Sequence, residues 1–503
     1  MKSRVFTGFL VALAIALAPA AELAADATAA SQRSGVGDRD SGFGIRDSGL
    51  ADETTLTHVL NRLTFGPRPD DVARLRDIGV ALWIDQQLHP ERIDDHAVAA
   101  LLPPLETAPG SADPQQLRRF ARQQIQTLAA EKILRATYSE RQLQEVLVDF
   151  WFNHFNVYAG KGRTAEYVAD YEQNVIRPHV FDRFRDLLEA DAKSPAMLFY
   201  LDNWLNAAPD REPGSGIRDP RARGSVVRPP RFPRVRRLRP IPNAEPRLPA
   251  AAAQRAKRQR GLNENYGREL LELHTLGVDG GYTQQDVINV ARAFTGWTID
   301  RDGRFRFVPA LHDQGEKIVL GHKIKAGGGI EDGEKVLDIV ASHPATARHI
   351  AYQLAQRLVA DEPPAALVER AAARFHESNG DLREVVRTIV TSPEFLGDAA
   401  RDAKFKTPFA LVVSTMRTTG ATISDARALV QALQQMGEAL YMCQPPTGYR
   451  NTADTWVSAG GLVSRMNFAT RVASGKMPGI ALPANPPSSD LALRLGSPEF
   501  QRF

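Results

Sequence analysis

Apolar side chains recur at intervals of three and four positions along most of the chain, the spacing that places them on one face of an α-helix. The clearest run comprises Leu143, Val146, Leu147, Phe150, Trp151 and Phe155. Over 263–297 the same spacing predicts two helices, one with Leu270 and Leu271 and the other with Val287 and Val290. The short connection between them favours direct packing of the pair. The pattern predicts a mainly α fold, built as a large multi-helix body.

Polar residues, prolines and glycines mark where several of these helices begin and end. Gly277 follows the last turn of the first helix in 263–297, where a left-handed residue without a Cβ ends a helix at low cost. Thr283 and Asp286 have the spacing of a capping box, with Asp in place of the usual Glu or Gln. Serine followed by proline predicts further helix starts at Ser194, Ser392 and Ser497. Another helix, rich in alanine, is predicted to open at His343.

Strand signals are scarce and short. The best candidates are 304–308 and 317–320, and Asp302 with Gly303 has the composition of a tight turn. Neither run is long enough for a large sheet. The sequence therefore predicts one small β-hairpin near 299–320.

The first residues have the pattern of a secretion signal. Lys2 and Arg4 form a positive n-region, 5–18 is apolar, and a small-x-small cleavage site ends at Ala20. The apolar stretch is too short to span a bilayer comfortably. No second apolar run of spanning length occurs in the sequence. We predict a signal peptide over 1–20, no transmembrane anchor, and a soluble mature protein that is periplasmic or extracellular.

The chain of 503 residues contains one cysteine, Cys443. No disulfide can form within the chain, so an exported protein of this sequence must be held together by its core. The apolar content of 43% is ample for that. A buried structural thiol is the expected state of Cys443, and a nucleophilic role is the alternative.

Two stretches differ in composition from the rest. Residues 21–51 repeat the letters RDSG and are poor in apolar residues, which predicts a disordered leader. An Arg/Pro-rich stretch at about 208–260 is predicted to be a disordered insert in a single helical domain over 52–503. Within it, 211–260 has 15 basic and 3 acidic residues, an excess of +12 in a chain whose net charge is +4. Its one aromatic residue, Phe232, offers no stacking platform, so no nucleic acid partner is expected; binding to an anionic polymer is the alternative to an insert without a partner.

A series of segments carries a resemblance to a known family. They are HVLNRLTFGPRPDDV from His58, DFWFNHFNV from Asp149, the stretch 263–297, HDQGEKIVLG from His312, HPATARHIAYQLAQRLVADEPP from His343, CQPPTGYRNTADTW from Cys443, and the closing SPEFQRF. In this order they resemble the bacterial family called domain of unknown function 1800, over roughly 52–207 and 261–503. The resemblance implies an exported, mostly helical protein, with an exported sulfatase-like protein as a possible partner. It brings no accepted catalytic mechanism.

The short motifs of well-known catalytic chemistry do not occur in the sequence. There is no HExxH, ExxH or GxSxG, no GxxxxGK[ST], and a single cysteine excludes CxxC. These motifs therefore identify neither a metal nor a cofactor. Candidate chemistry depends on individual histidines and charged residues.

Three histidines are candidates for acid/base or metal chemistry. His154 lies on the predicted helix beside aromatic residues, and the alternative is a core histidine with one backbone partner. His274 lies in the last turn of its helix, where the helix dipole favours a cation. It could be a general acid/base beside Glu269 or Glu272, with any direct partner coming from another element, and the alternative is a helix cap. His312 and Asp313 are adjacent in a predicted loop, and both could reach a metal or a substrate oxygen.

A ladder of charges lies on the first helix of 263–297. Glu264, Arg268 and Glu272 are spaced at i, i+4 and i+8, so they share one helix face. Arginine can bind a carboxylate, sulfate or phosphate with two hydrogen bonds. A buried, fold-specifying network is the other role that this ladder could have.

These features predict an exported protein with a polar pocket, acting as a metal-assisted or acid/base hydrolase on an envelope or extracellular polymer. The residues predicted to have catalytic roles are His154, Glu269, His274, His312 and Asp313. Those predicted to bind substrate are Glu264 and Arg268. The alternative is a non-catalytic scaffold that binds another exported, sulfatase-like protein.

Overall fold

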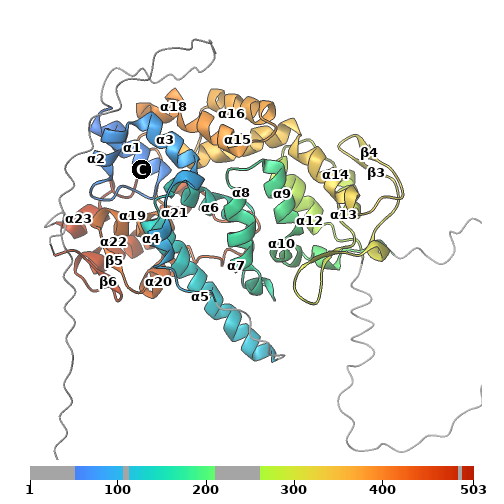
Figure 1. Cartoon of the computed structure of the whole chain (residues 1–503), viewed down its shortest axis with the longest axis horizontal. Helices are drawn as coiled ribbons and strands as arrows, with labels where there is room; N and C mark the ends of the chain where they lie inside the picture. Colours follow the sequence, from blue (N-terminus) through green and yellow to red (C-terminus); the bar gives the residue numbers. More distant parts are fainter. Residues whose placement is uncertain (1–50, 106–112, 210–260, 485–489) are drawn as a thin grey trace, which may run out of the picture. The chain divides into compact units, whose positions relative to one another are not determined.

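The computed structural model describes residues 51–105, 113–209, 261–484 and 490–503. All of these belong to one compact unit, made mainly of helices (Figure 1). The predicted signal peptide, the leader up to residue 50 and the insert over 210–260 lie outside the described residues. Among the helices of the described part, none has both the length and the apolar character needed to cross a membrane.

Helices form most of the described chain, as the spacing of apolar residues predicted. The N-terminal part contains α1 (Glu53–Leu63), α2 (Asp71–Ile78), α3 (Val80–Leu88), η1 (Pro90–Arg92), α4 (His96–Ala99) and α5 (Pro114–Tyr138). The central part contains α6 (Gln142–His154), η2 (Thr164–Glu166), α7 (Val168–Asp170), η3 (Tyr171–Ile176), α8 (Arg177–His179), α9 (Phe184–Lys193), α10 (Pro195–Tyr200), η4 (Asn203–Leu205), α12 (Asn265–Glu269), η5 (Leu270–Thr275) and α13 (Gln284–Ala293). The C-terminal part contains η6 (Pro309–Leu311), α14 (Ile330–Ala341), α15 (Pro344–Leu358), α16 (Ala365–Glu377), α17 (Leu382–Val390), α18 (Pro393–Leu396), η7 (Asp398–Ala400), α19 (Pro408–Thr419), α20 (Arg427–Gln435), α21 (Ala453–Trp456), α22 (Ala459–Ala473) and α23 (Leu491–Gly496).

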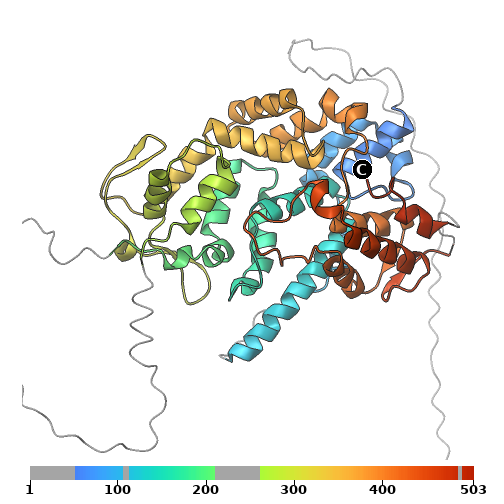
Figure 2. The same cartoon turned by 180° about the vertical axis from the view of Figure 1, so that it is seen from behind.

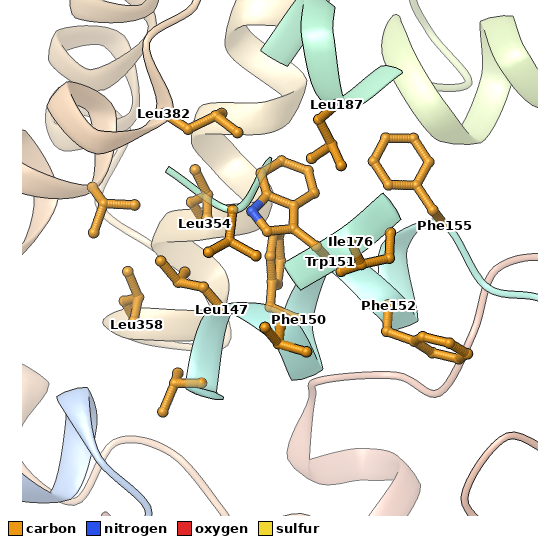
Figure 3. Packing of buried hydrophobic residues seen from close by; sticks show 14 of the residues in the cluster. Leu147, Phe150, Trp151, Phe152, Phe155, Ile176, Leu187, Leu354, Leu358 and Leu382 are labelled. Atoms are coloured by element: carbon orange, nitrogen blue, oxygen red, sulfur yellow. The ribbon is translucent and has the colours of Figure 1, made fainter. Parts of the chain in front are cut away.

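The apolar stripe predicted around Phe150 is the buried face of α6. Figure 3 shows the indole of Trp151 between Leu147 of the same helix and side chains of η3, α9 and α15, among them Leu187 and Leu354. Full burial of one such side chain contributes roughly 1.5–3 kcal/mol. Because α6 packs on several elements at once, the orientation of its last residue, His154, is well defined.

Neighbouring helices of the C-terminal half complete this core. α15 and α16 lie side by side in both views (Figure 1, Figure 2), and α17 packs against both. α15 also packs against η5. The segment of α15 that contacts the core therefore lies next to the first helix of 263–297, although the two are distant in sequence.

Most of the predicted helix boundaries are confirmed. Thr283 and Asp286 form a reciprocal capping box at the start of α13. The hydroxyl of Ser194 accepts from the amide of Ala196, and the side chain of His343 accepts from the amide of Ala345. Ser392 caps α18 in the same way. Gly277 follows η5 with φ of 83°, the left-handed conformation expected of it.

The prediction that a helix starts at Ser497 is wrong. Ser497 is the residue that ends α23, and the chain after it forms turns. The amide of Gln501 does bond the carbonyl of Ser497, but Lys404 and Phe503 then exchange backbone hydrogen bonds at 3.0 and 3.2 Å. Pairing of the last residues with a distant strand-like segment replaces the second turn that a helix would need.

The predicted hairpin is confirmed, and two further strand pairs accompany it within the described ranges. β1 (Trp297–Ile299) pairs antiparallel with β2 (Phe305–Phe307). The pair β3 (Lys317–Val319) and β4 (His322–Ile324) follows it, beside α13 and α14 (Figure 1). β5 (Thr422–Ile423) pairs with β6 (Ile480–Ala481). The prediction of a single hairpin missed this last pair because its two-residue strands are far apart in sequence and too short to show alternation.

Candidate functional site

A polar cavity of about 380 Å³ lies where α6, η5, α15 and the segment 447–452 meet. Its lining residues are Phe150, Asn153, His154, Glu272, Leu273, Val278, His349, Gln353, Gln356, Thr447, Tyr449, Arg450, Asn451 and Thr452. They come from the segments that begin at Asp149, Asn263, His343 and Cys443, each of which carries the family resemblance. The fold thus brings four distant recognisable segments to one hollow of a size that suits a small-molecule group.

His154, the last residue of α6, has one ring nitrogen already engaged. Its Nε2 donates to the carbonyl of His274 at 3.2 Å, so in the neutral ring Nδ1 is the nitrogen that can accept a proton. The ring also contacts Phe150, Trp151 and Phe155. His154 therefore has the contacts expected of a core histidine and also borders the cavity.

The protonation of His154 is governed by burial and by two neighbouring histidines. Burial lowers its pKa well below 6.5, and the nearby rings of His349 and His274 lower it further. The ring centroids are 6.2 Å apart for His154 and His349 and 6.4 Å apart for His154 and His274. We call these three residues the histidine cluster. At neutral pH its members are uncharged imidazoles, because burial also lowers the pKa values of His274 and His349.

His274 lies behind His154, on the π-helical segment η5. The sequence predicted that the helix end would favour its charged form, and this is wrong. A helix end contributes at most about 2 kcal/mol to a cation. Burial lowers the pKa of His274 from 6.5 to about 3, which corresponds to about 4–5 kcal/mol, so burial outweighs the dipole.

A buried carboxyl group, Asp191 of α9, lies beside His274. Its Oδ2 is 3.9 Å from His274 Nδ1, and its Oδ1 is 2.6 Å from the hydroxyl of Tyr171. That hydroxyl is also 2.8 Å from the carbonyl of Phe155, yet it has only one hydrogen to donate. A neutral Asp191 satisfies both contacts, because it donates to Tyr171 while Tyr171 donates to Phe155. Burial raises the pKa of Asp191 to about 8, which favours the same neutral form.

The sequence analysis did not single out His349, Asp191 or Arg450. His349 lies on α15, where its ring packs against Gly277: a Cβ on that glycine would be 2.9 Å from His349 Nδ1. The only signal for His349 and Arg450 was their place in segments that carry the resemblance. Asp191 had no signal, since its partners Tyr171 and His274 come from two other elements, η3 and η5.

Two backbone segments at this site, η5 and η3, are π-helical. η5 carries Glu272 and His274, and η3 begins with Tyr171. π-Helical turns are rare and occur frequently at functional sites. In η5 the extra residue per turn lets Glu272 line the cavity while His274 lies buried behind it.

Acidic residues of the first helix in 263–297 lie near the cavity. Glu272 lines it and accepts a hydrogen bond from Tyr282 at 3.2 Å. Glu269 is half-buried, and burial together with the negative charge of Glu272 raises its pKa. Glu269 is not among the residues that line the cavity. The neighbour of His274 comes from another element, as the sequence predicted: it is Asp191 of α9.

Glu264 and Arg268 form a partly exposed polar group with Gln284. Arg268 donates to Gln284 at 3.0 Å and lies 3.4 Å from Glu264, which also accepts from Gln284 at 2.6 Å. Exposed pairs of this kind contribute at most about 1 kcal/mol. These contacts tie α12 to the start of α13, but the group is partly exposed and Glu272 bonds Tyr282 instead, so the predicted buried network is wrong. Neither Glu264 nor Arg268 lines the cavity.

His312 and Asp313 belong to a different network, near β3. His312 Nδ1 bonds the carbonyl of Thr295 at 2.8 Å, and its Nε2 is 3.2 Å from Asp332. Asp313 accepts two hydrogen bonds from Arg292. Burial opposes ionisation of Asp313, but these bonds outweigh it and hold its pKa below the usual range. The contacts of this pair are local to the β3 region, and neither residue lines the cavity beside His154.

Cys443 is buried, as its structural interpretation predicted. Burial and the nearby Glu438 raise the pKa of its thiol to about 11. A thiolate is the reactive form of cysteine, so this residue is a poor nucleophile at neutral pH.

A buried ionic network supports the opposite side of α6. Lys132 lies 2.9 Å from Asp149, and Arg177 lies 2.6 Å from Glu145. Burial opposes the charge of Lys132, but Asp149 and Glu172 outweigh it and raise its pKa. Because each charge has a partner, the network holds α6 in register against α5 and α8.

Within the described ranges, no group of three or more histidine, cysteine and carboxylate side chains is arranged to hold a metal ion. In the histidine cluster, His154 already uses Nε2 for a backbone hydrogen bond. It could reach a ligand only through Nδ1. The arrangement suits proton transfer by a neutral imidazole.

Comparison with known proteins identifies the family but no characterised relative. Neither the curated proteins nor the solved structures give a match. The family described as "Protein of unknown function (DUF1800)" matches residues 58–502, nearly the whole chain. The chain therefore belongs to this family, as the order of its segments indicated.

Proposed function

We propose that the protein is an exported hydrolase that acts on an envelope or extracellular polymer, with the cavity beside His154 as its catalytic site. The observation that carries the proposal is the state of His154. Its Nε2 hydrogen is held by the carbonyl of His274, while the ring borders a cavity that also contains carboxylate and guanidinium groups. A neutral imidazole held in one tautomer is suited to general base catalysis.

In the proposed reaction, His154 accepts a proton at Nδ1 from a water molecule. The oxygen of that water attacks the carbon atom of the polymer bond that is hydrolysed. The bond to the leaving oxygen then breaks, and that oxygen takes the proton back from His154. When the attacked group is an ester, Arg450 in the cavity lining offsets the negative charge that develops on the carbonyl oxygen. Glu272 accepts hydrogen bonds from hydroxyl or amide groups of the bound polymer.

Export is the second part of the proposal. Its support is the N-terminal pattern of Lys2 and Arg4 followed by an apolar stretch and small residues. The proposed location is the periplasm or the cell exterior. A sulfatase-like partner stays a prediction from the family resemblance.

The test compares His154→Gln with the wild-type protein on panels of p-nitrophenyl esters and p-nitrophenyl glycosides. Glutamine can still donate to the carbonyl of His274 but is a very weak base. We expect hydrolysis of at least one class, with kcat/KM reduced roughly 100-fold or more in the variant. The matched control is His322→Gln, since His322 is an exposed histidine outside the cavity.

Circular dichroism and the thermal midpoint of each variant separate loss of chemistry from loss of folding. Equal hydrolysis by wild type and a folded His154→Gln variant would show that His154 is not the base. Absence of hydrolysis on both panels would also count against the proposal.

A further inference from the structure

A second hollow, of about 570 Å³, is lined in part by Phe199 of α10 and by the β1–β2 hairpin. We call it the aromatic groove. Its lining residues are Arg163, Tyr167, Phe199, Trp204, Thr298, Ile299, Asp300, Arg301, Arg306, Val308, Ala310 and Leu311. Its volume falls within the roughly 300–1,000 Å³ of typical ligand sites. None of the residues predicted from the sequence to form a site lies in it.

One wall of the groove is aromatic. The rings of Phe199 and Trp204 are stacked, with centroids 5.4 Å apart and planes within 8° of each other. Tyr167 extends this wall, with its ring 6.3 Å from that of Phe199. The indole Nε1 of Trp204 is buried and has no hydrogen-bond partner within the described part of the chain. The wall thus presents aromatic side chains to the groove.

The β1–β2 hairpin contributes cationic side chains to the same groove. Arg306 lies across from Thr298 in the hairpin register, and both line the groove. Arg301 and Arg306 are exposed. The one carboxylate here, Asp300, is engaged by the turn, because its Oδ1 accepts from the amides of Asp302 and Arg304. Arg301 and Arg306 form no ion pair within the described residues, and together they outweigh the single negative charge of Asp300 in the lining.

We propose that the aromatic groove binds a polysaccharide strand that contains uronic acids. The C–H faces of sugar rings pack on flat aromatic surfaces, as other apolar groups do. The carboxylate of a uronic acid matches the two-pronged geometry of a guanidinium group.

The groove is connected to the cavity beside His154 through one helix. α10 places Phe199 in the groove, and the next residue, Tyr200, donates its hydroxyl to the carbonyl of Gln444 at 2.7 Å. Gln444 belongs to the same segment as Tyr449 and Arg450, which line the cavity. The binding inference does not depend on hydrolysis, because it is tested by affinity alone.

The test measures binding of tetragalacturonate by isothermal titration calorimetry with the full chain. The double variant Arg301→Gln/Arg306→Gln should raise the Kd roughly tenfold or more, since two charge-assisted contacts are lost. Arg304→Gln is the matched control, because Arg304 is an exposed arginine of the same hairpin that does not line the groove. Its Kd should equal that of the wild type, and neutral maltotetraose should bind at least tenfold more weakly than the uronate.

Three results would overturn the inference. The first is an unchanged Kd in the double variant, and the second is equal affinity for maltotetraose. The third is loss of uronate binding on deletion of 210–260 with full binding retained in the double variant, which would assign the affinity to the basic insert. A sulfated tetrasaccharide or single-stranded DNA that binds more tightly than the uronate and shows the same sensitivity to the double variant would replace the uronic acid as ligand.

Discussion

Replacing Asp191 with asparagine should make the stability of this protein less dependent on pH. In the folded protein burial raises the pKa of Asp191 to about 8, whereas its ordinary value is 3.8. Between these two pH values the folded state holds a proton that the unfolded state has lost. The stability that this group contributes is fully present below pH about 4, and it is lost as the pH rises through the folded pKa.

The size of the effect follows from the two pKa values. A difference of about four pKa units, at about 1.36 kcal/mol per unit, allows at most about 5–6 kcal/mol of pH dependence. Between about pH 5 and about pH 8 the wild-type protein should lose roughly 4 kcal/mol of folding stability through Asp191. Asparagine has the shape of the neutral acid and donates to Tyr171 from its amide, so the variant keeps that hydrogen bond without the titration.

The assay is urea unfolding followed by circular dichroism, for wild type and Asp191→Asn, at about pH 5 and about pH 8. Groups common to both proteins cancel in the difference between them. The unfolding free energy of the variant minus that of wild type should be larger at pH 8 than at pH 5 by roughly 4 kcal/mol. Asp313→Asn is the control. The wild-type carboxylate of Asp313 has a lowered pKa and is ionised at both pH values, so this substitution should change the unfolding free energy by the same amount at both.

One outcome would refute this reasoning directly. If Asp191 were ionised at neutral pH and paired with a charged His274, asparagine would remove one partner of a buried ion pair. The variant would then lose roughly 3–5 kcal/mol, and it would gain no advantage on going from pH 5 to pH 8.

Three further changes test the site and its supports. Gly277→Ala should destabilise the protein by roughly 1–3 kcal/mol in urea unfolding, because φ is 83° there and the new Cβ would press on His349; unchanged stability would contradict this. Lys132→Met should cost roughly 3–5 kcal/mol, seen as a lower Tm, because Asp149 and the buried Glu172 would lose their counter-charge; an unaltered Tm would contradict it. In the proposed hydrolysis, kcat/KM should stay constant as the pH falls through 6.5 and decline only at lower pH, because the pKa of His154 is lowered; a decline centred at 6.5 would exclude His154 as the base.

The local elements of this protein were readable from its sequence. The apolar stripe on α6, the capping box of Thr283 and Asp286, the left-handed Gly277 and the β1–β2 turn all depend on residues at most a few positions apart. Such interactions are nearly the same in any tertiary context, because helix and turn geometry alone brings the partners together. The order of recognisable segments likewise sufficed to identify the family.

The site itself was decided by tertiary packing. His154 meets the carbonyl of His274, 120 positions later, and the ring of His349 comes from a third element. His312, equally plausible from sequence, lies with Asp332 near β3. Whether a histidine is charged or neutral, exposed or enclosed, depends on which distant side chains surround it. The spacing of residues along the chain does not specify those neighbours, so only the packing of the helices determines where the chemistry can occur.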